Sequence, residues 1–194
     1  MKISRRFTAV LGAAAAMALP VAAHAQVTYY TTGVFQSSNS NQIHAGGMFV
    51  TFNGLASTTT STPSNISFGS FVTSGATALA DGTFNDQFTL NVFQTAPSGG
   101  QGQFVGSFGG TITNTGSTAY WIPNQPLDFN IGNSTYTLFT NGTSAGQGYA
   151  IVAPNNNGGK TTIQGFVSTP EPSSMALLGT GLIGLVPMIR RKKQ

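Results

Sequence analysis

The chain has 194 residues, a formal net charge of +4 and no cysteine, which excludes disulfides, thiol catalysis and cysteine-ligated metals. The cations gather at the two ends, because the body from Gln26 to Thr169 holds only Asp81, Asp86, Asp128 and Lys160 as charged residues, a net charge of −2. A body without a basic patch does not fit nucleic-acid binding, so we expect no nucleic acid as a partner.

The first 25 residues (1–25) are typical of a secretory signal peptide. A short basic region that contains Arg5-Arg6 precedes an apolar, alanine-rich stretch. Ala23 and Ala25 are the small residues that signal peptidase requires, so we expect cleavage between Ala25 and Gln26. The arginine pair is also a feature of twin-arginine export, but the surrounding consensus is incomplete. We therefore expect export through the Sec translocon.

Residues 26–168 are the expected exported domain. Their number is that of a single domain. The region is poor in charge and rich in Gly, Ser, Thr, Asn and Gln, a composition that alone would permit disorder. However, thirteen of the fourteen Phe, all five Tyr and the single Trp lie within it. This number of large apolar side chains can build a core, so we expect the region to fold.

Apolar and polar residues alternate in short runs along this region, which predicts strands with one buried face. The predicted strands are 27–35, 47–52, 66–72, 88–93, 103–108, 111–113, 127–131, 136–140, 149–152 and 161–167. Turn-forming clusters separate them at 36–41, 58–65, 96–102, 123–126, 141–148 and 154–159. The one helix-like run, 76–80, is too short to stand alone. This spacing predicts an all-β domain, a β-sandwich or a jelly roll.

Few side chains of the body can perform acid–base chemistry. Asp81 and Asp86 suggest a glycosidase-type carboxylate pair or part of a calcium site, but aspartates in a turn commonly bond their own backbone. His44 stands alone, as structural histidines do. A Ser–His–Asp set is formally possible, but no G-x-S-x-G motif supports it. We expect no catalytic residue, metal or cofactor; a secreted hydrolase that uses Asp81, Asp86 or Asp128 is the alternative.

Aromatic side chains exposed on a sheet could bind sugars by stacking. Trp121, with Tyr120 beside it, is the best candidate, and packing of Trp121 in the core is the competing interpretation. A carbohydrate-binding module is therefore a second alternative function. Because Lys160 is the one cation of the body, we expect glycan binding of this kind to be insensitive to salt.

The last residues, 169–194, form three successive parts. The tripeptide Pro170-Glu171-Pro172 is held extended by its prolines, and the uncharged stretch 173–189 follows it. That stretch just reaches the length of a membrane-spanning helix. The chain ends on the cations Arg190, Arg191, Lys192 and Lys193, which the positive-inside bias places on the cytoplasmic side.

This order of tripeptide, apolar segment and basic end resembles the PEP-CTERM sorting signal, the C-terminal tag of exosortase substrates in Gram-negative bacteria. The resemblance covers 169–194. It implies that exosortase, a membrane cysteine protease-transferase, recognises the tag and removes the anchor. It also implies export in company with exopolysaccharide and biofilm components. An ordinary C-terminal tail anchor is the competing interpretation.

Together these features predict one all-β domain between a signal peptide and a transmembrane sorting helix. We expect a non-enzymatic protein of the cell surface or extracellular matrix, anchored transiently in the inner membrane. Its expected partners are exosortase, the Sec translocon and exopolysaccharide.

Overall fold

The computed structural model describes residues 25–77, 80–139, 142–143 and 146–170. The expected signal peptide up to His24 and the expected sorting helix lie outside these residues. Within the described part of the chain, no helix is long and apolar enough to cross a membrane. Residues Ala25–Pro170 form one compact unit, and it consists of strands, as the period-two pattern predicted.

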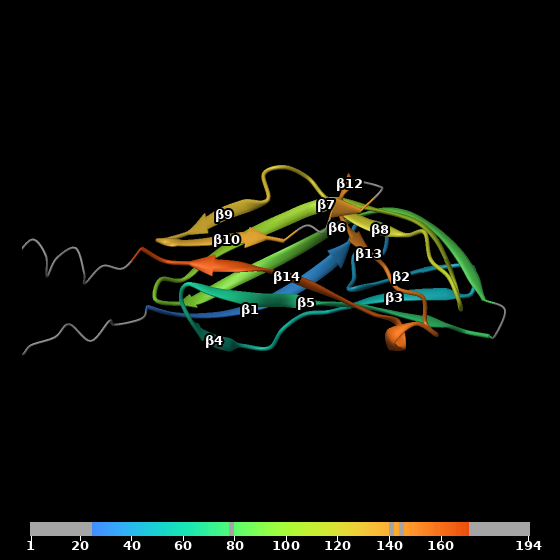
Figure 1. Ribbon diagram of the computed structural model, residues 1–194, viewed down its shortest axis with the longest axis horizontal. Helices are drawn as coiled ribbons and strands as arrows, with labels where there is room; N and C mark the ends of the chain where they lie inside the picture. The colour runs from blue at the N-terminus through green and yellow to red at the C-terminus, as the bar shows by residue number, and fades with distance from the viewer. Residues whose placement is uncertain (1–24, 78–79, 140–141, 144–145, 171–194) are drawn as a thin grey trace, which may run out of the picture. The chain divides into compact units, whose positions relative to one another are not determined.

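Two six-stranded antiparallel sheets build the domain (Figure 1). Sheet A contains, in spatial order, β13 (Tyr149–Ala150), β8 (Tyr120–Pro123), β7 (Gly100–Thr113), β6 (Asp81–Ala96), β1 (Gln26–Phe35) and β4 (Thr58–Ser61). Sheet B contains β2 (Gln42–Ala45), β3 (Met48–Asn53), β5 (Ser64–Gly75), β14 (Lys160–Ser168), β10 (Ser134–Leu138) and β9 (Asp128–Ile131). The short strands β11 (Gly142–Thr143) and β12 (Gly146–Gln147) pair with each other, and one 3₁₀ turn, η1 (Asn157–Gly159), precedes β14.

The inner faces of the two sheets meet in an aromatic core. Phe88 of β6 contacts Phe35 in its own sheet at a ring-centroid distance of 4.8 Å and Phe71 of sheet B at the same distance. A second group of rings joins Tyr29 of sheet A to Tyr136 of sheet B at 6.0 Å. Such pairs add about 0.5–1.5 kcal/mol each beyond the burial of their area. The fold is therefore a sandwich of two curled sheets that aromatic side chains hold together.

Buried hydroxyl and amide groups also link the sheets. The Tyr136 hydroxyl donates to Gln94 Oε1 at 2.9 Å, and the Tyr29 hydroxyl donates to the Ser67 carbonyl at 2.9 Å. The Tyr149 hydroxyl donates to the Gln164 carbonyl at 2.8 Å. Each phenol must stay protonated to donate. These hydrogen bonds fix how the two sheets are placed on each other.

We expect the domain to lose stability in alkaline solution. Burial raises the pKa of Tyr29 from 10.0 to about 12 and raises the pKa values of Tyr136 and Tyr149 as well. A raised folded-state pKa means that the stabilisation is complete below pH 10 and is lost as the pH rises through the folded-state pKa. Denaturant melts from pH 7 to pH 12 should show a constant midpoint up to about pH 9.5 and a steady fall above it. Tyr136→Phe should reduce that fall, and an equal fall in the variant would contradict this assignment.

Most of the predicted strands lie where the structure has them, but several features differ. The segments 103–108 and 111–113 are one strand, β7, because Gly109 and Gly110 continue the pairing with β6, and Gly110 carries no side chain where Thr118 and Ala119 come close. The prediction of a turn over 58–65 is wrong, since β4 lies at Thr58–Ser61 and β5 begins at Ser64. Strands β2 and β8 were not predicted, and the short strands β11 and β12 lie in the segment 141–148 that was predicted as a turn.

A bulge in β5 shapes the outer face of sheet B. Ile163 pairs with Gly69 and Gln164 with Ser67, so Phe68 has no partner on β14. Gly69 has φ +119°, a conformation that favours glycine, and a Cβ atom there would lie 2.5 Å from the Asn53 carbonyl oxygen. Its N–H donates to Ser67 Oγ at 3.1 Å. The bulge therefore interrupts the regular pairing of β5 with β14 between Ser67 and Gly69.

Candidate functional site

The two ends of the domain meet at one buried threonine. The Ala25 carbonyl accepts a hydrogen bond from Thr62 N–H at 2.8 Å and another from Thr62 Oγ1 at 3.1 Å. The hydroxyls of Thr62 and Thr169 also bond to each other, and these two residues are 2 % and 9 % exposed. In Figure 1 the start of β1 and the end of β14 accordingly lie at the same end of the domain.

The predicted sorting motif follows this junction without a spacer. Strand β14 ends at Ser168, Thr169 is buried and Pro170 is exposed. Glu171, Pro172 and the four terminal cations lie outside the described residues, as does Ala23 of the expected signal cleavage site. Ala25, the last residue before the expected cleavage, is described, and its carbonyl accepts hydrogen bonds from Thr62. Both expected processing sites therefore border the same hydrogen-bonded junction.

We expect Thr62→Val to destabilise the domain by about 1–3 kcal/mol, because the buried Thr169 hydroxyl loses its partner. Chemical denaturation of the fragment 25–170 measures this change. Thr59→Val is the matched control, since Thr59 is exposed on the edge strand β4, and we expect a change within about 0.5 kcal/mol. Equal effects of the two substitutions would show that the junction adds nothing.

The structure overturns Trp121 as a sugar-stacking residue. Trp121 is 0 % exposed, and its ring packs against Tyr149 at 5.6 Å and Phe88 at 5.4 Å. Its pairing opposite Phe108 places it on the inner face of sheet A. The competing interpretation, packing in the core, is correct. Tyr120 is the half-buried neighbour on the outer face, opposite Gly109.

The aspartates do not form a catalytic pair. Asp81 and Asp86 lie on one strand, β6, whose register with β7 is uninterrupted, so an odd separation of five puts their side chains on opposite faces. Asp86 accepts hydrogen bonds from Ser37 N–H at 3.1 Å and from Ser37 Oγ at 2.7 Å, which fixes the turn after β1. Asp128 lies on β9, in the other sheet.

No metal cluster forms among the described residues, where no three His, Cys, Asp or Glu side chains gather. The calcium interpretation of Asp81 and Asp86 fails for the same geometric reason as the carboxylate pair. His44 is exposed on the edge strand β2, and its ring stacks on Phe49 of β3 with centroids 5.9 Å apart. It therefore has the structural role that a solitary histidine suggested.

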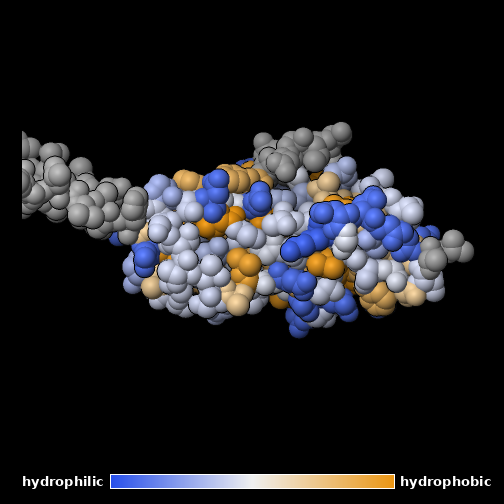
Figure 2. All heavy atoms as spheres, turned by 60° about the horizontal axis from the view of Figure 1, so that its bottom comes forward, coloured by the Kyte–Doolittle hydropathy of each residue, from blue (hydrophilic) through white to orange (hydrophobic). Residues whose placement is uncertain are grey.

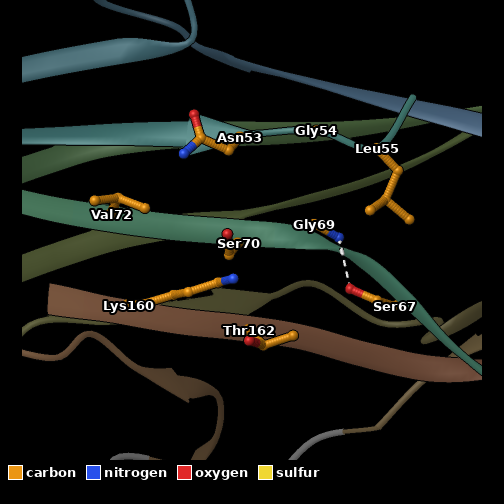
Figure 3. Close-up of a pocket in the computed structure, with 9 residues that line it drawn as sticks. All are labelled: Asn53, Gly54, Leu55, Ser67, Gly69, Ser70, Val72, Lys160 and Thr162. Carbon is orange, nitrogen blue, oxygen red and sulfur yellow. Dashed lines mark hydrogen bonds between the residues drawn. The ribbon is translucent and has the colours of Figure 1, made fainter. Parts of the chain in front are cut away.

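A hollow on the outer face of sheet B is the best-defined candidate binding site, and sequence reasoning missed it. Its volume is about 300 Å³, and nine residues line it: Asn53, Gly54, Leu55, Ser67, Gly69, Ser70, Val72, Lys160 and Thr162. We call it the Lys160 hollow. Figure 3 shows the Lys160 side chain extending along β14 toward Ser70, with Asn53 and Leu55 on the far side of β5. Ser67 and Gly69, which flank the bulge, belong to its lining, and no sequence motif marks it.

A second hollow, of about 270 Å³, continues the first along the same face. Asn65, Ile66, Ser67, Phe139 and Gln164 line it, so Ser67 belongs to both. Among the described residues, Phe139 is the exposed large apolar side chain, at 39 %. In the view of Figure 2, small apolar spots are scattered over a surface on which pale residues predominate.

Comparison with known proteins identifies the C-terminal segment. Residues 168–193 match the family model of the PEP-CTERM protein-sorting motif. No curated protein and no solved structure matches the chain. The prediction of this sorting signal from Pro170-Glu171-Pro172, the apolar stretch and the basic end is therefore confirmed.

Proposed function

We propose, from the exosortase sorting motif that this chain carries, that it is a non-enzymatic component of the bacterial cell surface or extracellular matrix. The motif itself implies an exported protein that exosortase processes at the membrane. After processing, the folded β-sandwich leaves the membrane and remains in the hydrated layer outside the cell.

The observation that carries this proposal is the position of the motif. It begins at the last residues of β14, where Thr169 is buried and Pro170 is exposed. A cut beyond Pro170 would thus release the sandwich whole, with its junction between Thr62 and Thr169 intact. The low charge and the many hydroxyl and amide groups of the domain suit a polysaccharide environment.

The order of the processing steps follows from the same junction. The carbonyl of Ala25 is bonded to Thr62, so the peptide bond that signal peptidase would cut is part of the folded end. We therefore infer that the signal peptide, Ala25 included, is removed during export through the Sec translocon, before these hydrogen bonds to Thr62 can form. Arg190 to Lys193 would hold the precursor with its domain outside the cytoplasm until exosortase acts.

Fractionation of the native host tests the proposal. Antibodies against the sandwich should detect a shortened chain in the surface and extracellular fractions, and it should sediment with exopolysaccharide. An exosortase deletion should move the signal to the membrane fraction at precursor length. A full-length chain that stays in the inner membrane of the wild-type host would contradict the proposal.

A carbohydrate-binding role is the second candidate, and the two adjoining hollows on sheet B favour it. They place hydroxyls, amides, one cation and one exposed ring on a single face. A hydrolase that uses Asp81 and Asp86 as a pair has no such support, because these side chains lie on opposite faces of β6.

A further inference from the structure

The Lys160 hollow holds a positive charge that the neighbouring strands do not neutralise. Lys160 is the one cationic side chain between Gln26 and Thr169. Of the three aspartates in that range, Asp81 and Asp86 belong to sheet A, and Asp128 lies on β9, separated from β14 by β10. The lysine is exposed and borders a concave surface, so an anionic group that enters the hollow meets no acidic competitor there.

The rest of the lining is what a sugar ring requires. Asn53 offers an amide, while Ser70 and Thr162 offer hydroxyls, and these groups can bond ring hydroxyls. Leu55 and Val72 give an apolar surface for the C–H face of a ring. A volume of about 300 Å³ lies at the lower end of the range for small-molecule sites.

Two glycines in the lining lie so close to neighbouring backbone that neither position has room for a side chain. A Cβ atom on Gly69 would lie 2.5 Å from the Asn53 carbonyl oxygen, and one on Gly54 would lie 2.1 Å from the Thr31 carbonyl oxygen. Thr31, which is buried on β1, connects two segments beside the hollow. Its Oγ1 donates to the Phe68 carbonyl at 2.7 Å and accepts from Leu55 N–H at 2.8 Å. The floor of the hollow is therefore fixed by hydrogen bonds before a ligand arrives.

The second hollow lies further along β14, next to Gln164, and extends the Lys160 hollow along this strand. From Lys160 to Gln164 the strand advances by about 13 Å, which suits an extended ligand rather than a single small molecule. Phe139 stands at the far end, and its N–H is bonded to the Gln164 carbonyl at 3.0 Å. An exposed ring held by its backbone in this way is suited to stacking on a second sugar.

We propose that the outer face of β5 and β14 binds a segment of an acidic polysaccharide. The Lys160 ammonium pairs with a sugar carboxylate, and Phe139 stacks on a ring further along the same chain. This inference rests on the proposed function, since it names the matrix component that the exported sandwich contacts. It also replaces Trp121 by Phe139 as the stacking residue, and it replaces the expectation of salt-insensitive binding by dependence on one charge.

The experiment uses the full chain in detergent and two matched probes, tetragalacturonate and its fully methyl-esterified form, in isothermal titration calorimetry. We expect the acidic probe to bind more tightly, and its affinity to fall when NaCl rises from about 50 to about 500 mM. The ester should be unaffected by salt. Failure of the acidic probe to bind, or equal affinity for both probes, would overturn the inference.

Single substitutions test the roles of Lys160 and Phe139 in binding. Lys160→Gln should weaken the acidic probe by about tenfold and leave the ester unchanged, whereas Lys160→Arg should keep most of the affinity. Phe139→Ala should weaken both probes alike. Gln103→Ala, exposed on the outer face of sheet A, is the control and should change neither. An unchanged affinity in Lys160→Gln or in Phe139→Ala contradicts the assignment.

The polysaccharide site and the proposed function can fail separately, because different experiments test them. Release of the shortened chain in the host without binding of the probe would remove the polysaccharide site alone. Probe binding by a chain that the host never releases would leave the site and remove the matrix role.

Discussion

Replacement of Glu171 by alanine should leave the full-length precursor in the membrane fraction and nearly abolish the released form. Glu171 is the one acidic residue between Thr169 and the C-terminus, and it lies in the tripeptide at the start of the matched sorting motif. Loss of its carboxylate removes the charged feature by which a membrane protease can tell this extended tripeptide from the apolar residues that follow. Immunoblots of cell fractions measure the distribution, and mass spectrometry of released wild-type protein should lack 175–194.

The matched control is Glu171→Asp, which keeps the charge and shortens the side chain by one methylene. We expect it to retain most of the release. If Glu171→Ala were processed like the wild type, the tripeptide would not be the recognition element. An intact C-terminus on released wild-type protein would contradict anchor removal itself.

Phe88→Ala should destabilise the sandwich by about 3–5 kcal/mol, the largest loss that we expect from a single substitution. Phe88 is 0 % exposed, and its ring contacts rings in both sheets, including Phe52 of sheet B at 5.0 Å and Trp121 of sheet A at 5.4 Å. Its removal leaves a cavity between the sheets. A loss of this size is a large share of the about 5–15 kcal/mol of a typical domain.

Denaturant unfolding of the fragment 25–170 measures the effect by circular dichroism. Phe139→Ala makes the same chemical change at an exposed ring and should shift the free energy of unfolding by less than about 1 kcal/mol. The melt should be indifferent to reducing agent, because the chain has no cysteine. A Phe88→Ala loss no greater than that of Phe139→Ala would show that these rings do not hold the sheets together.

The strands were predictable because alternation is a local property of the sequence. Phe88, Leu90 and Val92 point inward along β6, and a period of two reveals this without knowledge of the partner strands. Strand β4 escaped prediction because Thr58–Ser61 has no apolar alternation. It is a strand because its backbone pairs with β1 at the edge of sheet A.

Which face a residue occupies, in contrast, depends on pairing that the sequence does not display. Trp121 is buried and Tyr120 half-buried because β8 aligns Trp121 with Phe108. Lys160 was identifiable as the one cation of the body, but its hollow is lined by residues far from it in the sequence, such as Gly54 and Gly69. The sorting motif could be predicted without knowledge of strand pairing, because its three parts are contiguous in the sequence.

The position of β14 has a mechanical consequence. This strand lies inside sheet B, paired with β5 from Lys160 to Val167 and with β10 beside Thr135–Leu138, and the chain leaves it at Pro170 toward the sorting segment. While the precursor is tethered, drag on the domain pulls along the strand axis. The hydrogen bonds on both sides then carry the load together in shear, whereas an edge strand would peel away one bond at a time. The sandwich is thus built to withstand tension at the end by which it is held.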